Sequence, residues 1–215
     1  MTHLQRPLLH TFLALAALAG SVAPAHANLL SNASFEAAVP GLGAGGFCYL
    51  GNTCTGAMPG WAGNAPVIAS SSGPWGTPSS LGGYSYGAQL VGLQNASHVA
   101  QTLALAAGSY SLSWADAGRS GYQPARYDVL FDNVLLGIFN TNPGDAWARN
   151  SLSFTATGGG ELRFAGRAIS NDGTAFIDGL VLTGRAAQVP EPQSLALVAL
   201  ALAGLGLSSR RRAQR

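Results

Sequence analysis

Two stretches decide the fold: residues 109–115 read SYSLSWA, and residues 127–131 read YDVLF. In the first, the large side chains of Tyr110, Leu112 and Trp114 alternate with serine or other small residues, and the second stretch repeats this alternation. A period of two places successive side chains on opposite faces of an extended strand. Both stretches are therefore predicted to be half-buried β-strands.

The same pattern recurs along most of the chain. Similar short runs occur at 87–93, 98–105, 134–139, 150–157, 161–166 and 176–182. Clusters rich in Gly, Asn, Asp, Ser and Pro separate the runs, and no convincing amphipathic helix lies between them. Evenly spaced strands with turn signals predict an all-β, antiparallel β-sandwich, with a loop-rich stretch from Pro40 to Gly83.

The N-terminus has the features of a secretory signal peptide. Arg6 precedes an apolar stretch at 12–20, and Ala25-His26-Ala27 supplies the small-x-small pattern of a cleavage site. A buried N-terminal helix is the alternative, but the apolar stretch has no polar face. We therefore predict a signal helix in residues 1–27, with cleavage between Ala27 and Asn28 by signal peptidase.

The C-terminus carries a second apolar segment. Residues 195–207 are all apolar or glycine, and flanking serines extend the run to 194–209, which barely spans a hydrocarbon core of about 30 Å. The residues around this predicted transmembrane helix are Pro190, Glu191 and Pro192 before it, and Arg210, Arg211, Arg212 and Arg215 after it. The positive-inside rule leaves the arginines in the cytoplasm and everything before Pro190 outside.

This tail resembles the PEP-CTERM sorting signal of Gram-negative bacteria, over residues 188–215. The resemblance implies recognition by exosortase, a membrane enzyme that cuts near the triplet, so that Pro190, Glu191 and Pro192 are processing residues. It also implies a precursor anchored in the inner membrane and a mature protein at the cell surface or outside the cell. An ordinary single-pass anchor is the alternative, but it does not explain the triplet.

Residues 28–187 are predicted to form one domain. From 28 to 189 the chain has six arginines against eight carboxylates, and it contains no lysine. The printed net charge of +2 comes from Arg6 and the tail. With no basic stripe, the sequence gives no support for nucleic-acid binding.

Cys48 and Cys54 are predicted to form a disulfide that closes a small surface loop, because an exported chain folds in an oxidising compartment. The alternative is a metal site, which would need more sulfur or histidine ligands than this neighbourhood contains.

A second resemblance covers nearly the whole predicted domain. In order, the stretches NLLSNASFE (28–36), PGW (59–61), YGAQLVGL (86–93), VAQTLALAAGSYSLSW (99–114), Trp147 before NSLSFTAT, and AFIDGLVL (175–182) are similar to the galactose-binding-like jelly rolls. That group includes many carbohydrate-binding modules of bacterial glycoside hydrolases. The resemblance implies a jelly-roll β-sandwich.

The same resemblance implies a structural calcium ion where the first and last strands meet. Glu36 stands at the Glu of the SFE motif, and Asp178 stands at the Asp of FIDGL. Two carboxylates from opposite ends of a domain, together with backbone carbonyls, suit the oxygen preference of Ca²⁺. In the alternative, Asp178 caps a turn and Glu36 is solvated. No catalytic cofactor is indicated.

A sugar site needs exposed aromatic faces and a few planar polar groups. The candidate aromatic residues lie in loop-like segments and are Trp75, Tyr84, Tyr86 and Tyr122, and the candidate polar partners are Gln89, Arg126 and Asp128. By contrast, Trp61, Trp114 and Trp147 are expected in the interior. The strand positions that face away from the core carry mostly small residues, which is unusual for a sugar-binding sheet.

The sequence favours a protein that is not an enzyme. His98, the single histidine left after removal of the signal peptide, lies in a strand run and not beside a nucleophile motif. The acidic residues that a hydrolase would need are Asp116, Asp128, Asp132 and Glu161, and nothing in the sequence selects a pair among them.

Together these features predict an exported, non-enzymatic protein of the bacterial surface or extracellular matrix, associated with exopolysaccharide and biofilm. The first alternative is a lectin-like, carbohydrate-binding module with a defined glycan site. The second alternative is a glycan-active hydrolase.

Overall fold

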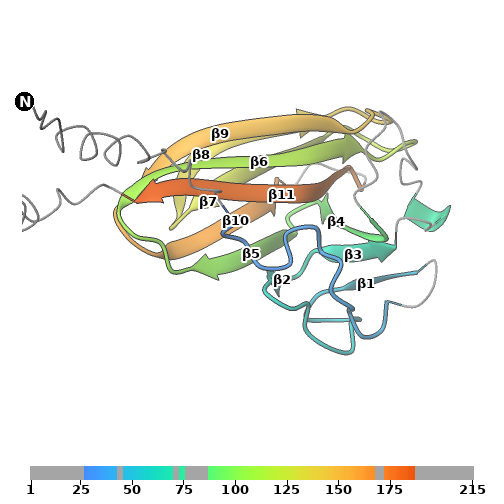
Figure 1. The fold of residues 1–215 in the computed structure, drawn as a ribbon. Helices are drawn as coiled ribbons and strands as arrows, with labels where there is room; N and C mark the ends of the chain where they lie inside the picture. The colour runs from blue at the N-terminus through green and yellow to red at the C-terminus, as the bar shows by residue number, and fades with distance from the viewer. Residues whose placement is uncertain (1–26, 43–45, 70–72, 76–86, 168–171, 187–215) are drawn as a thin grey trace, which may run out of the picture.

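A computed structural model describes residues 27–42, 46–69, 73–75, 87–167 and 172–186, and these form eleven strands and one short 3₁₀ helix (Figure 1). The elements are β1 (Phe47–Tyr49), β2 (Ala62–Gly63), β3 (Pro66–Ala69), η1 (Gly73–Trp75), β4 (Gln89–Gln94), β5 (His98–Leu103), β6 (Gly108–Gly118), β7 (Ala125–Phe131), β8 (Val134–Thr141), β9 (Ala148–Ala156), β10 (Gly160–Gly166) and β11 (Thr174–Ala186). The eight longer strands, β4 to β11, lie where the alternating runs predicted them.

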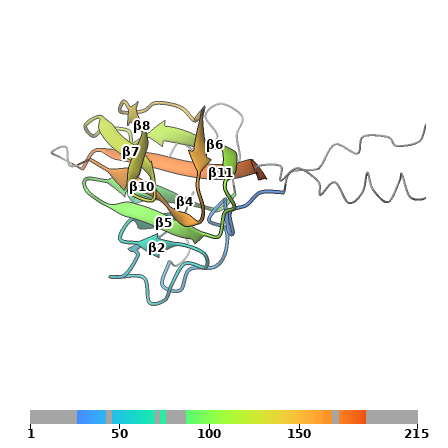
Figure 2. The same cartoon turned by 90° about the vertical axis from the view of Figure 1, so that its left-hand side faces the viewer.

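The strands form two antiparallel sheets. The first sheet has the order β1-β3-β4-β11-β6-β9, and the second has the order β2-β5-β10-β7-β8. Figure 2 shows the strands of the second sheet side by side. From β4 to β7 and from β8 to β11, successive strands alternate between the two sheets, which is the winding of a jelly roll. The predicted all-β jelly-roll sandwich is confirmed.

The large residues of the alternating runs fill the space between the sheets. In β6, Tyr110, Leu112 and Trp114 are buried, and in β7 the same holds for Tyr127 and Val129. The residues between them, serines in β6 and Asp128 in β7, point to the outer faces, as the period of two requires. The sequence pattern therefore selected the strand part of the main core, to which residues such as Phe35, Met58 and Val67 add from the stretch before β4.

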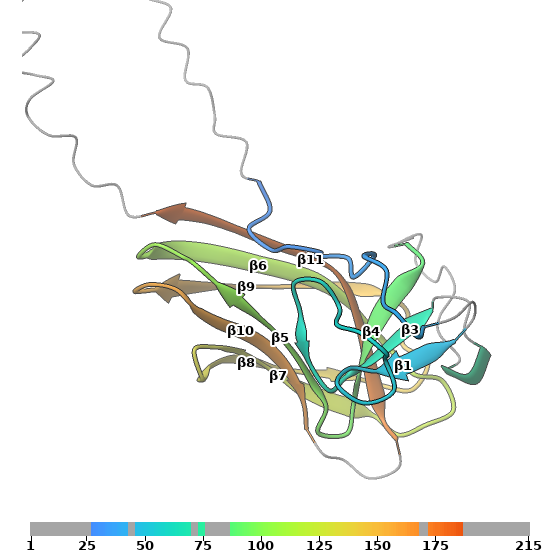
Figure 3. The same cartoon turned by 90° about the horizontal axis from the view of Figure 1, so that it is seen from below.

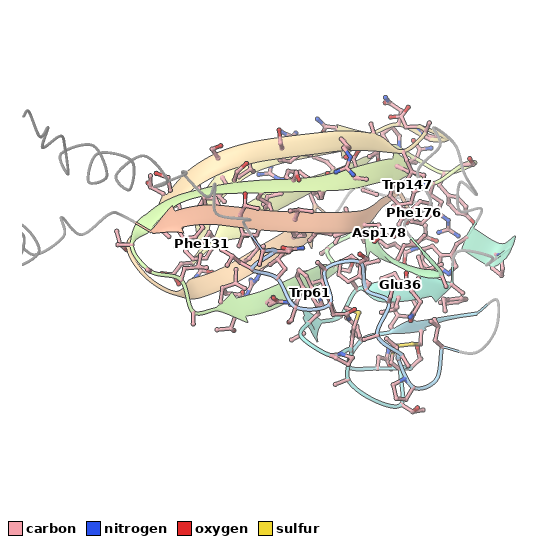
Figure 4. The ribbon with its side chains drawn as sticks, in the orientation of Figure 1. Glu36, Trp61, Phe131, Trp147, Phe176 and Asp178 are labelled. Atoms are coloured by element: carbon pink, nitrogen blue, oxygen red, sulfur yellow. A yellow bond between two sulfur atoms is a disulfide. The ribbon has the colours of Figure 1, made fainter. Side chains whose placement is uncertain are left out.

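A second, smaller core lies on the outer face of the first sheet. Ala115 and Ala117 of β6 face outward there and pack with Phe176, under the rings of Trp75 and Trp147 (Figure 4). Trp61, Trp114 and Trp147 are buried, as expected. The expectation that Trp75 is exposed is wrong, because the ring is 3% exposed and covers this cluster.

The two ends of the sandwich differ. The described chain begins and ends at one of them (Figures 1 and 3), where Ala186 of β11 lies opposite Gly108 of β6. The Leu29 N–H donates to the Leu182 carbonyl (2.9 Å), which aligns the first described residues with β11. We call this the tail end; it includes loops 104–107, 132–133 and 157–159. The far end carries turns 94–97, 119–124 and 142–147.

The two predicted terminal helices, in 1–27 and 194–209, lie almost wholly outside the described residues, as do Pro190 to Pro192 and the arginine cluster. Within the described ranges, the structure contains no helix with the length and apolar character needed to cross a membrane.

Candidate functional site

Glu36 is held by the backbone that leads into β4. Its carboxylate accepts hydrogen bonds from the N–H groups of Ala88 and Gln89, both at 3.0 Å. In return, the Gln89 side-chain amide donates to the Glu36 carbonyl at 3.0 Å. The N-terminal segment is thus fixed against β4, and the Glu36 carboxylate keeps further lone pairs.

Asp178 lies on β11, where the register with β6 shifts between Asp178 and Val181. Its side chain is 2% exposed, and its Oδ1 accepts the Gly179 N–H at 2.6 Å. Burial raises the pKa of Asp178 from 3.8 to about 8; the Gly179 N–H opposes this shift, and the negative charge of Glu36 adds to it. The carboxyl groups of Asp178 and Glu36 are therefore close enough to interact (Figure 4).

The oxygens around these two carboxyl groups fit a calcium ion. The side-chain oxygen of Gln89 is buried and has no hydrogen-bond partner among the described residues. An orphaned amide oxygen on a residue that is hydrogen-bonded to Glu36, together with the carboxyl groups of Glu36 and Asp178, would give an all-oxygen donor set of the kind that Ca²⁺ prefers. In the described ranges no three His, Cys, Asp or Glu side chains form a metal-binding group, so backbone and amide oxygens would complete the coordination.

The structure does not bring the predicted sugar contacts together. Trp75 is buried, and Gln89 is 9% exposed and bonded to Glu36, so neither lies on an open surface. Tyr84 and Tyr86 lie outside the described residues. Tyr122 is 40% exposed in a far-end turn.

Arg119 explains the position of Tyr122. Its guanidinium carbon lies 4.3 Å from the ring centroid of Trp75 and 3.6 Å from that of Tyr122. The Nη2 atom donates to the Pro74 carbonyl at 3.2 Å. This stack of a cation between two rings fastens turn 119–124 to η1.

Arg126 and Asp128 lie on the outer face of the second sheet, because both alternate with the inward-facing Tyr127. Asp128 forms an ion pair with Arg167 at 2.7 Å. They are therefore separate from Tyr122 and from the Glu36 region.

Two of the candidate acids of a hydrolase are neighbours, because the Asp132 N–H donates to the Glu161 carbonyl at 2.9 Å, whereas Asp128 lies apart from them. Glu161 pairs with Arg163 at 2.6 Å. Asp128 lies opposite Ala165 of β10, four residues along from Glu161, a separation of about 13 Å at the rise of a β-strand. That exceeds the roughly 5–10 Å between the two carboxyl groups of a glycosidase.

Two other titratable residues discussed from the sequence, Asp116 and His98, have pKa values that burial shifts. Asp116 is buried and accepts a hydrogen bond of 2.7 Å from the Tyr127 hydroxyl, which itself accepts one of 2.8 Å from Trp114 Nε1. Burial is the main cause that raises the pKa of Asp116. Burial also lowers the pKa of His98, which lies at the start of β5.

A polar groove lies at the far end, between the Cys48–Cys54 loop and turn 94–97. It has a volume of about 360 Å³, and its polar lining residues are Tyr49, Asn52, Asn64, Gln94, Asn95 and Ser97. We call it the amide groove. None of the residues that line it carries a formal charge.

Hydrogen bonds fix part of this lining and leave the rest available. The Tyr49 hydroxyl donates to Gln94 Oε1 at 2.9 Å, and Asn64 Oδ1 accepts the His98 N–H at 2.8 Å. The amide NH₂ groups of Gln94 and Asn64 remain as donors, and Asn52 is exposed. The groove therefore has preorganised planar amides beside a tyrosine ring.

An adjacent hollow extends the amide groove. It measures about 440 Å³ and includes Met58 and Trp61, and it shares Leu50 and Asn52 with the groove. The predicted disulfide between Cys48 and Cys54 is confirmed, and it closes the loop that lines both hollows. Sequence reasoning missed these residues, because asparagines in NTC and QNAS are also what ordinary turns contain.

Comparison with known sequences concerns the tail. The sequence model of the PEP-CTERM protein-sorting motif matches residues 188–212. Residues 188–212 carry a PEP-CTERM sorting motif. The motif implies an exported protein with a C-terminal sorting signal that exosortase processes. No curated protein matches the sequence significantly.

Several solved carbohydrate-binding modules are similar to the domain. The CBM36-1 domain of a multidomain xylanase, from the hindgut metagenome of Trinervitermes trinervoides, is 21% identical, with 45% of this chain and 79% of that chain covered and a TM-score of 0.39. TmCBM61 in complex with β-1,4-galactotriose is 16% identical over 74% of this chain and 99% of that chain, with a TM-score of 0.46. A CBM36 in complex with calcium and xylotriose is 25% identical over 43% and 79%, with a TM-score of 0.38. Because these TM-scores are below 0.5, the assignment of the fold rests on the strand order of the two sheets.

Proposed function

We propose that this chain is an exported, non-enzymatic surface protein that binds neutral glycans through the amide groove. The observation that carries the proposal is the groove itself, in which Asn52, Asn64 and Gln94 present planar amides beside Tyr49 without a charged group. Amide side chains match pairs of sugar hydroxyls, and an aromatic ring contacts the C–H face of a sugar.

The position of the groove supports this role. Gln94 lies opposite Thr174, the first residue of β11, whereas β11 ends twelve residues later, at the end that precedes the PEP-CTERM motif. A strand of that length spans about 40 Å. A precursor held by its tail would thus present the amide groove on the side away from the membrane.

The calcium site would serve stability and not chemistry. Glu36, Asp178 and Gln89 Oε1 would hold the ion, which would tie the N-terminal segment to β4 and β11. No reacting group would lie beside the ion. The ion would instead fix β4, the strand that leads into turn 94–97.

The remaining parts of the proposal follow from the termini. Signal peptidase would cut after Ala27, exosortase would cut near Pro190 to Pro192, and the domain would reach the surface or matrix of a Gram-negative cell. Exopolysaccharide of a biofilm is the glycan that such a protein would meet.

The glycan proposal can be tested with the full chain in a detergent without a sugar headgroup. We expect saturable binding to at least one neutral polysaccharide in a panel of xylan, β-glucan, galactan and dextran. Asn52→Ala should weaken that binding about tenfold, since one to two hydrogen bonds contribute roughly 1.4 kcal/mol.

Asn140→Ala is the matched control, because Asn140 is an exposed asparagine on β8, distant from the groove. It should leave the affinity unchanged. No binding to any member of the panel, or equal losses in both variants, would contradict the assignment of the groove.

A further inference from the structure

The loops at the tail end form one continuous surface. Gly108 pairs with both Ala156 and Ala186, which joins loop 104–107 to loop 157–159 and to the end of β11. Gly160 pairs with Leu103 and lies against the Phe131 ring, which brings in the turn at 132–133. Figure 4 shows Phe131 at this end.

This surface is apolar and almost free of charge. Val134 is 64% exposed and Leu135 is 47% exposed, the two highest values among the exposed large hydrophobic side chains. Three exposed alanines of loop 104–107 lie at the same end of the second sheet, so the tail-end patch consists of Ala104, Ala106, Ala107, Val134 and Leu135, with Val134 and Leu135 on opposite faces of β8. The three loops contain one charged residue, Asp132, and no cation.

The length of the chain beyond β11 limits how far this patch can lie from a bilayer. Eight residues, 187–194, separate Ala186 from the apolar run that starts at Leu195. Fully extended, they reach at most about 29 Å. That is less than the length of β11, so the domain cannot stand upright with its far end on the bilayer, and the tail end stays within about 29 Å of the start of the apolar run.

We propose that the tail-end patch docks on the outer surface of the lipid bilayer while the tail anchors the precursor. This inference rests on the anchored precursor of the proposed function and is independent of the glycan. The docked domain keeps the tail end at the bilayer surface, and it directs the amide groove outward.

The tether makes a weak patch sufficient. Two large aliphatic side chains and three alanines bury too little apolar area to hold a free domain on lipid. A short linker, however, gives the patch a local concentration in the millimolar range, so docking becomes an intramolecular step. Because the patch lacks cations, docking depends on apolar contact and not on anionic lipid.

The test uses the full chain inserted in phosphatidylcholine vesicles that contain lipid brominated on its acyl chains, which quenches nearby tryptophan. In Val134→Trp, the added emission should be quenched. In Gln123→Trp, which places the probe on an exposed far-end residue, it should not. The emission of the native tryptophans is measured in the unaltered chain and subtracted. Quenching of the added tryptophan in Val134→Trp should persist at high salt.

Ala106→Trp is a second reporter in case Val134→Trp does not fold, and its quenching should be lost when Val134→Asp and Leu135→Asp are added. Carbonate extraction distinguishes a failure of the membrane anchor from a failure of the docking alone. Release of the chain from the vesicles by carbonate would overturn both the anchor and the docking. A chain that resists extraction, yet shows no quenching at residues 134 and 106, would overturn the docking alone, as would a cross-linked dimer through the patch.

Discussion

The buried carboxyl of Asp178 can be satisfied in two ways, by a proton or by a cation. Its pKa of about 8 in the folded chain, against 3.8 as the ordinary value, means that the folded state binds the proton more tightly than the unfolded state does. In the metal-free fold, the contribution of Asp178 to stability is therefore fully present below about pH 4, and it is lost as the pH rises through 8. A bound calcium ion would replace the proton, so it should stabilise most at the upper end of this range.

We expect the EDTA-treated chain to lose a few kcal/mol of unfolding free energy between pH 4 and pH 8, and added calcium to restore it at pH 8. Asp178→Asn should abolish both effects, because an amide neither titrates nor supplies the charge. Thermal melts over this pH range, with and without calcium, measure this. A calcium response that survives in Asp178→Asn would show that the ion binds elsewhere.

Glu36 and Asp178 were singled out through the resemblance of SFE and FIDGL to the galactose-binding-like jelly rolls. The structure places the two carboxyl groups near enough to interact, and their role as calcium ligands stays a prediction. Gln89 and Trp75 were misplaced, since polar and Gly/Ser/Pro-rich surroundings suggest exposure. Gln89 is in fact committed to the Glu36 carbonyl, and Trp75 to a second core on the outside of a sheet. Such burial by distant elements has no local signal.

At the level of elements, the hairpin β7–β8 shows how turn chemistry sets register. Phe131 lies opposite Val134, so the loop is two residues, and Asp132 and Asn133 have φ angles of 48° and 63°. Positive φ at both positions is the signature of the type I′ turn that suits twisted strands. An L residue other than Asn or Asp pays about 1–2 kcal/mol there.

Asn133→Ala should therefore lower the unfolding free energy by about 1 kcal/mol, whereas Asn133→Gly should leave it equal or raise it slightly. Chemical denaturation of both variants measures the difference. Equal stability of the two would mean that the turn does not need its left-handed backbone.

The longer strands were predictable because alternation is local, whereas β1, β2 and β3 were hidden in a stretch that reads as loop. These strands have only two to four residues. Their pairing depends on distant partners, such as Val91 opposite Val67 and Val99 opposite Gly63. The amide groove is built on these short elements, so a sequence that does not reveal them cannot reveal the groove.

At the scale of the whole sandwich, the described chain begins and ends at the tail end, and the amide groove lies at the far end. Asn28 locks this arrangement, because its side chain donates to the Leu180 carbonyl and accepts the Leu182 N–H, both at 2.9 Å. Cleavage of a signal peptide after Ala27 would leave this contact intact. The sequence predicted a role for each terminus, but only the fold shows that the described chain begins and ends at the same end of the sandwich.

The Cys48–Cys54 bond connects stability with recognition across this molecule. It closes a short loop, because the two cysteines are six positions apart in sequence, and replacing both by alanine should lower the unfolding free energy by about 2 kcal/mol. Asn52 lies inside that loop, and we therefore expect the double variant to lose affinity for the glycan as well. The calcium response at Asp178 and the lipid quenching at residue 134 should be unchanged, because neither site contacts the loop. Melting curves and glycan titrations on the same preparation test this, and an affinity equal to that of the unaltered chain would show that the loop does not shape the groove.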